Sequence, residues 1–413
     1  MKKHPESWMM SHGYNPKWSE GSVKTPIFQT STFAFNNSAE GKRFFALAYG
    51  KDQAAEGEQL GLIYSRLNNP NMQILEERLA LWEGADEAAA FESGMSAIAT
   101  TMLAYLKPGD VVLFSHPTYG GTHHFVHQVL VEFGIERIDF DPHDSYDSIC
   151  DKIESAQAWS RVKMVYVETP ANPTNDLFDL EMLNAIRNEI QLKGDHDVLF
   201  AVDNTYMGPL WQKPMDFGAD IVCYSATKYL SGHSDLIAGV VVGKKEHVVK
   251  VKTLRTFLGN MIAPYTAWLL TRSIETLKIR MDQQAKNALD VVAFLEANPK
   301  VSKIYFPGSK SQGENQIALF QKQCSSAGAM ISFDVVGDEE GAFRVLDHCE
   351  LIKLAVSLGS NESLAQHPFS MTHADVADEE KIRLGITEGM IRLSVGIENS
   401  EDIIADLKQA LEV

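Results

Sequence analysis

Short apolar runs alternate with longer amphipathic stretches along the middle of this chain. The almost continuously apolar runs are Ala88–Phe91, Val111–Phe114, Ile135–Phe140, Val162–Val167, Val198–Val202, Ile221–Tyr224 and Gly239–Val242. Such runs are typical of strands buried on both faces of a parallel sheet. The amphipathic stretches, beginning with Met72 to Trp82, predict helices that cover the sheet. We therefore expect an α/β architecture, in which ligands bind beyond the carboxyl ends of the strands.

The pattern changes after about residue 265. Apolar residues at helical spacing predict one long helix from Ala267 to Ala297, which Asn298 and Pro299 end. Two later segments alternate apolar and polar residues, as half-exposed strands do. The residues that share a face in each segment are Ile331, Phe333 and Val335, and Ile391, Leu393 and Val395. Helices over such a sheet predict a smaller α+β domain.

Residues 1–70 show neither pattern, and Ser, Gly, Asn and Pro are scattered through them. We expect an extended arm that packs on something else, with completion of a neighbouring subunit as its functional alternative. The expected organisation is therefore an arm (1–70), an α/β domain that binds the ligand (71–266) and a C-terminal α+β domain (267–413).

Composition excludes several functions. The 413 residues include 37 Lys and Arg against 55 Asp and Glu, which gives a net charge of −18. This balance argues against nucleic acid and against an anionic membrane surface as partners, because basic residues bind both. The four cysteines have no CxxC pairing, and Met1–Ser7 is not followed by the apolar segment of a secretory signal. We expect a soluble, cytoplasmic protein without a spanning helix.

Polar residues follow the buried runs. Gly94, between Ser93 and Met95, lets backbone N–H groups approach an anion at the start of an apolar helix. Tyr119 precedes two glycines, where its ring can stack on a planar ligand. Asn172 lies in a loop made rigid by two prolines, and its amide can donate and accept hydrogen bonds. Taken alone, the turn at Gly94 is better explained as an ordinary strand-to-helix turn, and an ordinary aromatic residue in a turn explains Tyr119 equally well.

Two further strand ends carry charge. Asp203 follows Val198–Val202, where a carboxylate is costly unless it meets a cation. Lys228, close to Ser225 and Thr227 at the mouth of an apolar site, is a candidate for a lysine that forms a Schiff base. A phosphate-binding turn, a stacking tyrosine, an aspartate for a pyridinium nitrogen and a lysine nucleophile are together what pyridoxal 5′-phosphate (PLP) requires.

The motifs around these residues carry a family resemblance. They are YSRLNNPN (64–71), SGMSAI (93–98), TYGGT (118–122), VETPANP (167–173), VDNTY (202–206), SATKYLSGHSD (225–235) and RLSVGIE (392–398). By them the chain resembles the PLP-dependent enzymes of cysteine and methionine metabolism, which include cystathionine synthases and lyases, methionine γ-lyases and O-acylhomoserine sulfhydrylases. The resemblance implies the aspartate-aminotransferase-like type I fold, with a mostly parallel seven-stranded sheet. It also implies a homodimer, or a homotetramer of two dimers, with active sites shared across each dimer interface.

The resemblance also implies roles for individual residues. Lys228 would bind PLP covalently and move protons, Tyr119 would stack on the ring and act at the leaving group, and Asp203 would keep the pyridine nitrogen protonated. Asn172 would contact the ring oxygen or the substrate carboxylate. The groups implied for the phosphate are Gly94, Met95, Ser225 and Thr227, with Tyr64 and Arg66 from the neighbouring subunit. The groups implied for the amino-acid substrate are Ser357 and Arg392.

Val356 indicates the reaction within this family. Cystathionine synthases and lyases usually carry Glu there, whereas methionine γ-lyases usually carry Val within a stretch like Ala355–Gly359. The chain differs from well-studied methionine γ-lyases at Gly121, where those have Cys, and its segment 43–62 is longer than the usual arm. We expect γ-elimination on L-methionine or a related sulfur amino acid, giving 2-oxobutyrate, ammonia and a thiol. The alternative is γ-replacement, as in cystathionine γ-synthase or O-acylhomoserine sulfhydrylase, because both reactions use the same residues.

Two other functions are less favoured. A catalytically silent PLP-binding protein would have no reason to keep Lys228, Asp203, Tyr119 and Arg392 together. A metal site at His123, His124 and His127, which include an i, i+4 pair, lacks an acidic ligand at matching spacing. We expect these histidines to lie on a helix face or at an interface, and no metal to bind.

Overall fold

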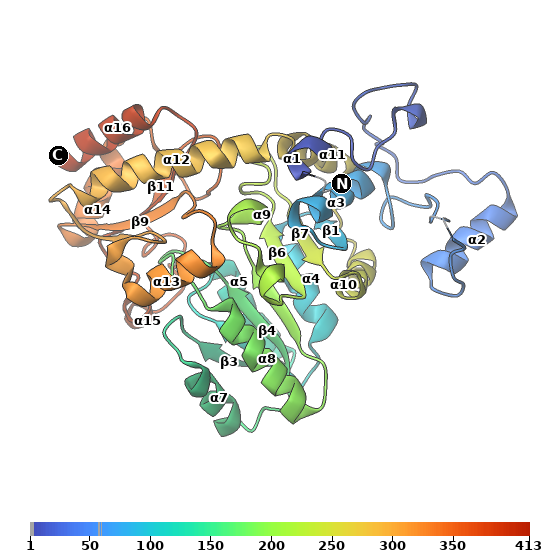
Figure 1. Cartoon of the computed structure of the whole chain (residues 1–413), viewed down its shortest axis with the longest axis horizontal. Coiled ribbons are helices and arrows are strands. Elements are labelled where there is room, and N and C mark those ends of the chain that lie inside the picture. The colour runs from blue at the N-terminus through green and yellow to red at the C-terminus, as the bar shows by residue number, and fades with distance from the viewer. Residues whose placement is uncertain (1–3, 57, 59) are drawn as a thin grey trace.

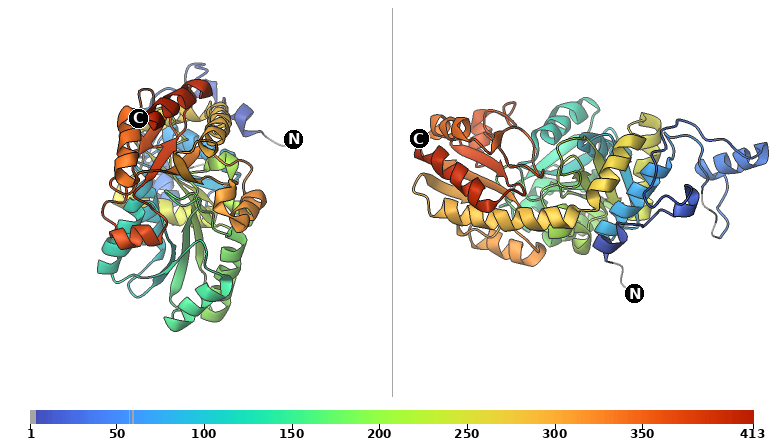
Figure 2. Two further views of the ribbon diagram at one scale, coloured as in Figure 1. Left: turned by 90° about the vertical axis from the view of Figure 1, so that its left-hand side faces the viewer. Right: turned by 90° about the horizontal axis from the view of Figure 1, so that it is seen from above.

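The computed structural model describes residues 4–56, 58 and 60–413. Residues 1–3 of the expected arm and residues 57 and 59 of its 43–62 segment lie outside the described residues. Figure 1 shows a central sheet in the middle of the molecule, a second sheet near the C-terminus on one side, and the N-terminal arm on the other. The two views in Figure 2 agree with this arrangement.

The central sheet contains every strand that the apolar runs predicted. In chain order the strands are β1 (Glu87–Phe91), β2 (Val111–Ser115), β3 (Glu136–Phe140), β4 (Val162–Glu168), β5 (Leu199–Asp203), β6 (Ile221–Ser225) and β7 (Gly239–Gly243). Their spatial order is β1-β7-β6-β5-β4-β2-β3 in a seven-stranded sheet. β7 is antiparallel to both its neighbours, and the other pairs are parallel. The predicted α/β fold class is confirmed.

Helices cover both faces of this sheet. They are α3 (Pro70–Glu83), α4 (Gly94–Tyr105), α7 (Tyr146–Ser155), α8 (Leu180–Gly194) and α10 (Lys245–Leu258), with the shorter α1 (Pro5–Trp8), α5 (Gly120–His124), α6 (Leu130–Glu132) and α9 (Gly208–Trp211). Val111 and Leu113 of β2 pack in one core with α3, α7 and α8, whereas Val112 and Phe114 pack in a second core with α4 and α10. Since successive side chains of a strand point to opposite faces, each position of a strand covered on both sides is apolar.

A five-stranded sheet forms the C-terminal part. Its strands are β8 (Val301–Tyr305), β9 (Met330–Val335), β10 (Lys353–Leu354), β11 (Leu364–Gln366) and β12 (Met390–Ser394), in the spatial order β10-β11-β12-β9-β8. The helices of this part are α12 (Leu277–Glu296), α13 (Glu314–Gln323), α14 (Asp338–His348), α15 (Asp378–Arg383) and α16 (Ser400–Glu412). The two alternating segments of the sequence are β9 and β12, which pair with each other antiparallel.

The single helix predicted from Ala267 to Ala297 is in fact two helices, so this prediction was wrong. α11 (Pro264–Ile274) ends before Thr276, and α12 begins at Leu277. The carbonyl of Ser273 accepts the N–H and the hydroxyl of Thr276, each at 3.2 Å, and Nη2 of Arg280 at 3.1 Å. These donors occupy a carbonyl that a continuous helix would pair with the N–H four residues later.

The arm was predicted to be irregular, and this prediction is wrong for residues Ser38–Ala48. α2 (Ser38–Ala48) forms there and projects from the body of the molecule (Figures 1 and 2). The side chain of Asn37 accepts the Glu40 N–H at 2.9 Å and caps the first turn. Phe45 and Tyr49 stack with ring centroids 6.0 Å apart and are 41% and 61% exposed. A helix this short is marginal alone in water, and these two aromatic side chains leave an apolar surface exposed on it.

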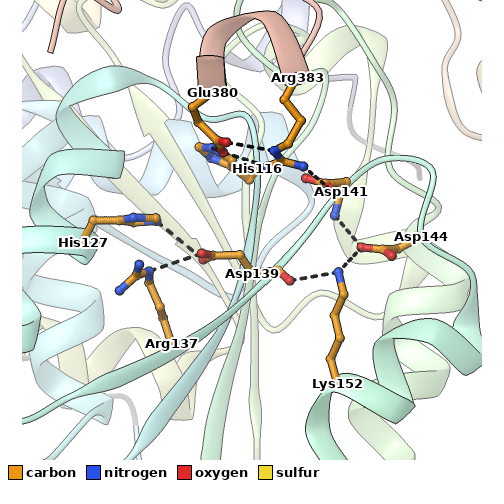
Figure 3. A network of polar contacts seen from close by, with 9 residues as sticks. All are labelled: His116, His127, Arg137, Asp139, Asp141, Asp144, Lys152, Glu380 and Arg383. Atoms are coloured by element: carbon orange, nitrogen blue, oxygen red, sulfur yellow. Dashed lines mark hydrogen bonds and ion pairs between the residues drawn. The ribbon is translucent and has the colours of Figure 1, made fainter. Parts of the chain in front are cut away.

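Charged side chains join α15 to the edge of the central sheet, as Figure 3 shows. Arg383 contacts Asp141 at 2.8 Å, and Glu380 contacts the imidazole of His116 at 3.2 Å. His116 lies directly after β2, and Asp141 lies directly after β3. The C-terminal part is therefore held against the strand ends of the central sheet, where the sequence places the candidate site.

The three histidines of the expected helix face lie beside this network. His127 faces Asp139 at 3.5 Å, and His123 stacks on His127 with ring centroids 3.8 Å apart. His124 lies 3.6 Å from Asp375. Within residues 4–56, 58 and 60–413, no group of three or more His, Cys, Asp or Glu side chains is arranged to hold a metal ion. The same part of the chain contains no helix long and apolar enough to cross a membrane.

A buried ion pair holds α10 against α3 and β1. Nη1 of Arg255, which is 2% exposed, donates to Oε1 of Glu76 at 2.6 Å and to the carbonyl of Ala90 at 2.7 Å. Lys252 contacts the other carboxylate oxygen of Glu76 at 2.8 Å. Removing one partner of a buried pair is costly, because the remaining charge stays in the core without compensation.

We predict that Glu76→Ala lowers the free energy of unfolding by about 3–5 kcal/mol, because Arg255 would remain buried without its carboxylate. The measurement is urea denaturation followed by tryptophan fluorescence. The control is Lys278→Ala, which removes an exposed contact to Asp282 at 2.6 Å and should cost less than about 1 kcal/mol. Equal losses in the two variants would contradict a special role of the buried pair.

Candidate active site

A cavity of about 260 Å³ lies at the carboxyl ends of β4, β5 and β6, where the fold class predicts a ligand. The predicted site residues that line it are Gly94, Met95, Tyr119, Asn172, Asp203, Ser225, Thr227 and Lys228. Ser357 and Arg392 adjoin this set through hydrogen bonds to Lys228 and Asn172. The structure thus brings together residues that are spread over most of the chain.

Lys228 lies in the turn that follows β6. Its backbone N–H donates to the carbonyl of Ser225 at 3.1 Å, and its Nζ donates to Oγ of Ser357 at 3.2 Å. Burial and, to a smaller extent, the nearby guanidinium of Arg392 together lower the pKa of Lys228 to about 8. A neutral amine, which is the nucleophilic form, is therefore accessible near physiological pH.

Asp203 ends β5 with its side chain buried in the cavity. Its Oδ1 accepts the N–H of Thr205 at 3.0 Å and the hydroxyl of Thr205 at 2.6 Å, and its Oδ2 accepts the hydroxyl of Tyr166 at 3.5 Å. Burial raises the pKa of Asp203 in spite of these bonds. Its hydrogen-bond partners among the described residues are neutral, and the protonated pyridine nitrogen of PLP would supply the missing cation.

Gly94 begins α4 beside Ser225. A Cβ at position 94 would lie 2.8 Å from the Cβ of Ser225 and 2.9 Å from its Cα, so the helix can approach β6 this closely only with glycine there. The first N–H groups of a helix have no carbonyl partner within it. Here the N–H of Ser96 donates to Oγ of Ser93 at 3.0 Å, and those of Gly94 and Met95 have no hydrogen-bond partner among the described residues. Such a helix start favours an anion, so the phosphate of PLP fits this end of the cavity.

Tyr119 and Asn172 come from loops after β2 and β4. Oδ1 of Asn172 accepts Nη1 of Arg392 at 3.0 Å, which turns the amide toward the C-terminal sheet. A Cβ at Gly121 would lie 2.6 Å from Cε1 of Tyr119, so the absence of a side chain there leaves room for the ring. Tyr119 is 45% exposed, and its ring is therefore available to a ligand in the cavity.

Arg392 reaches the site from β12 of the smaller sheet. Its side chain is buried, and its Nη2 donates to the carbonyl of Ser357 at 3.1 Å. A buried guanidinium at the edge of a cavity is suited to bidentate contact with a carboxylate. The residues gathered at this end of the cavity therefore come from both sheets.

Tyr64 and Arg66 do not line the cavity of their own chain. Nη1 of Arg66 donates to the carbonyl of Thr256 at 2.7 Å, and Tyr64 is 41% exposed. Their expected role at a neighbouring subunit's phosphate thus requires a second chain.

Several lining residues were missed by the sequence reasoning. They are Ser93, Ile98, Glu168, Thr205, Tyr206, Ile237 and Leu358. Glu168, Thr205 and Tyr206 lie in the same strand-end motifs as Asn172 and Asp203, so the position of these motifs was a signal that could have found them. Ile237 lies in a loop without such a signal.

Comparison with known proteins agrees with this geometry. The family model described as "Cys/Met metabolism PLP-dependent enzyme" matches residues 6–412. An L-methionine gamma-lyase from Fusobacterium nucleatum subsp. polymorphum is 41% identical over 394 residues, covering 95% of this chain and 94% of that protein. A cystathionine gamma-lyase from Bacillus subtilis is 37% identical over 413 residues, covering 100% of both.

A solved structure has the same fold. It is cystathionine gamma synthase from Xanthomonas oryzae pv. oryzae in complex with aminoacrylate and cysteine. The TM-score is 0.88 at 32% sequence identity, and the match covers 100% of this chain and 98% of that one.

The lowered pKa of Lys228 predicts how the PLP-free protein takes up PLP covalently. Only the neutral amine attacks an aldehyde, so the rate should rise with pH to a midpoint near 8 and not continue toward the ordinary lysine value of 10.5. The measurement is stopped-flow absorbance, with borohydride trapping to confirm attachment at Lys228. Free Nα-acetyl-lysine is the control amine. A midpoint equal to that of the free amine would contradict the effect of burial.

Proposed function

The chain belongs to the Cys/Met metabolism PLP-dependent enzyme family, and from that premise we propose that it is a carbon–sulfur lyase. The proposed reaction is γ-elimination on L-methionine or a related sulfur amino acid, giving 2-oxobutyrate, ammonia and a thiol. The observation that carries the proposal is the cavity that combines the amine of Lys228, of lowered pKa, with the carboxylate of Asp203 and the adjacent guanidinium of Arg392. Full-length relatives named L-methionine gamma-lyase favour elimination among the family's reactions.

Apolar side chains at the site favour a substrate with an uncharged tail. Leu358 and Ile237 line the cavity, and Val356, two residues before Leu358, is 61% exposed. A charged tail would lose hydration against these side chains without gaining a partner. The thioether of methionine has no such cost.

Each polar group has a task in this reaction. Bound PLP would supply an electron sink next to the α-carbon of the substrate. Arg392 would bind the α-carboxylate. The neutral Nζ of Lys228 would accept the proton from Cα, and it must release that proton to the bound cofactor before it can accept a second one from Cβ. Asp203 holds the proton on the pyridine nitrogen, and the hydroxyl of Tyr119 donates a proton to the sulfur as its bond to Cγ breaks.

γ-Replacement is the second candidate, and the solved cystathionine gamma synthase with a TM-score of 0.88 favours it. It uses the same groups of this chain, but a thiol adds to Cγ where elimination would release a 2-oxo acid. The two reactions are therefore separated by products and not by residues.

Purified enzyme should release 2-oxobutyrate from L-methionine faster than from L-cystathionine, because the apolar side chains of Ile237 and Leu358 suit an uncharged tail. The assay follows 2-oxobutyrate from each amino acid and from O-acetyl- and O-succinylhomoserine, with and without an added thiol. Lys228→Ala, the control, should lower kcat by about 100-fold or more. If methionine gives no 2-oxobutyrate and an acyl-homoserine reacts efficiently with the added thiol, elimination is refuted and γ-replacement is the function.

The proposal also assigns each part of the chain a place in an oligomer. The arm (1–70) completes the site of a neighbouring subunit through Tyr64 and Arg66, residues 71–266 bind PLP, and residues 267–413 supply Ser357 and Arg392. Within the part of the chain that the structure describes, the cavity lining includes no arginine, which supports an arginine from elsewhere for the phosphate. A homodimer is the minimum assembly, and a homotetramer is compatible with it.

All four cysteines are free, which supports a cytoplasmic location.

Shared sites predict complementation between two inactive variants. In a heterodimer of Lys228→Ala and Arg66→Ala subunits, one site carries both native residues, because Arg66 comes from the other chain. Mixing the variants after mild dissociation should therefore restore activity, up to half of the wild-type value per heterodimer. The control is a mixture of Lys228→Ala and Asp203→Ala subunits, which restores nothing because both residues belong to one chain. Equal activity of the two mixtures would contradict shared sites.

A further inference from the structure

Glu168 is the last residue of β4 and has no role in the reaction described above. Its Oε2 accepts the backbone N–H of Tyr119 at 2.8 Å, and its Oε1 accepts the backbone N–H of Asn172 at 3.2 Å. Its own backbone N–H donates to Oγ of Ser115, at the end of β2, at 2.9 Å. One carboxylate therefore joins the loop that carries Tyr119 to the loop that carries Asn172.

Burying this carboxylate destabilises the fold. Glu168 is 4% exposed, lines the cavity and pairs in register with Asp203 on β5, so two acids lie side by side. Burial and, after it, the neighbouring Asp203 raise the pKa of Glu168 well above its ordinary value, and the two backbone N–H groups and the nearby Arg392 offset this rise only in part. Among the described residues, the hydrogen-bond partners of Glu168 are neutral backbone N–H groups. The guanidinium of Arg392 donates to Asn172 and Ser357 and not to Glu168. Stability alone would favour a neutral side chain at this position.

We propose that Glu168 is a positioning residue, which sets the ring of Tyr119 and the amide of Asn172 in one fixed relation to the PLP ring. Because both loops are bonded to the two oxygens of one planar group, neither can shift without the other. Misplacement of such groups by about 1 Å can cost up to about 100-fold in rate. The inference rests on the proposed function only in placing Tyr119 and Asn172 at PLP, and it is independent of which amino acid reacts.

The test is Glu168→Gln, which keeps the shape of the side chain. Its amide oxygen can accept one of the two backbone N–H groups, but its NH₂ group cannot accept the other. At saturating PLP we expect a weaker circular dichroism band of the bound cofactor, because this band reports how the ring is held. We also expect kcat to fall by about 10- to 100-fold with little change in KM. The Tm of the PLP-free protein should stay unchanged or rise, because the change removes the repulsion between Glu168 and the neighbouring buried acid Asp203.

Asp406 offers a matched control away from the cavity. It is 6% exposed, and its two oxygens accept the backbone N–H groups of Glu350 at 2.8 Å, Leu351 at 3.0 Å and Ile352 at 2.8 Å. Asp406→Asn should lower the Tm of the PLP-free protein and leave the dichroism band and kcat of the PLP-loaded enzyme unchanged. The pair of variants thus separates holding a loop for stability from holding it for the cofactor.

The inference is overturned if Glu168→Gln behaves like Asp406→Asn, with a lower Tm but a native dichroism band and kcat. Native values of all three quantities would overturn it equally. If Glu168→Gln does not yield folded protein, Glu168→Asp replaces it, because a shorter carboxylate cannot reach both loops; its expected loss of band and kcat is the same. A changed band in an enzyme that fails to release 2-oxobutyrate from methionine would uphold the inference and refute only the proposed reaction.

Discussion

Glu168 and Asp203 end neighbouring parallel strands in register, so two carboxylates enter one cavity side by side. Burial raises the pKa of both carboxyl groups, whereas it lowers the pKa of Lys228 and so favours its neutral amine. Each of these groups loses stabilisation by being there, and the apolar cores on both faces of the sheet must offset that loss. A cofactor with a cationic ring nitrogen and an anionic phosphate restores the pairing that the cavity lacks. The demand for buried charge to be compensated therefore connects the fold to the ligand.

The strands of the central sheet could be predicted because burial on both faces leaves no polar position in runs such as Val162–Val167. Their spatial order could not, since nothing in Gly239–Val242 shows that this run enters antiparallel between β1 and β6. The break between α11 and α12 was also hidden, because apolar spacing continues through it. It depends on the contact of Arg280 with the carbonyl of Ser273, which is a matter of side-chain geometry and not of periodicity.

The candidate site, like the fold, contains residues that could be predicted from the sequence and residues that could not. Asp203 and Lys228 could be predicted because carboxyl ends of parallel strands converge, so polar residues there meet whatever the strand order. Glu168 was missed, although its motif was recognised, because it acts through the backbone N–H groups of other residues and these have no side-chain signature. Arg66 could be assigned only by resemblance, since the group it is proposed to bind belongs to another copy of the chain.

A line of hydrogen bonds from the smaller sheet to Lys228 shows why the two sheets must act together. Nη2 of Arg392, on β12, donates to the carbonyl of Ser357, and the hydroxyl of Ser357 accepts Nζ of Lys228. The same guanidinium contributes to the lowered pKa of Lys228 and is proposed to hold the substrate carboxylate. A displacement of β12 would thus change substrate binding and the protonation of the amine at once. The contacts of Glu380 and Arg383 with the strand ends of the central sheet oppose such a displacement, so the C-terminal part is a working component of the site and not only its cover.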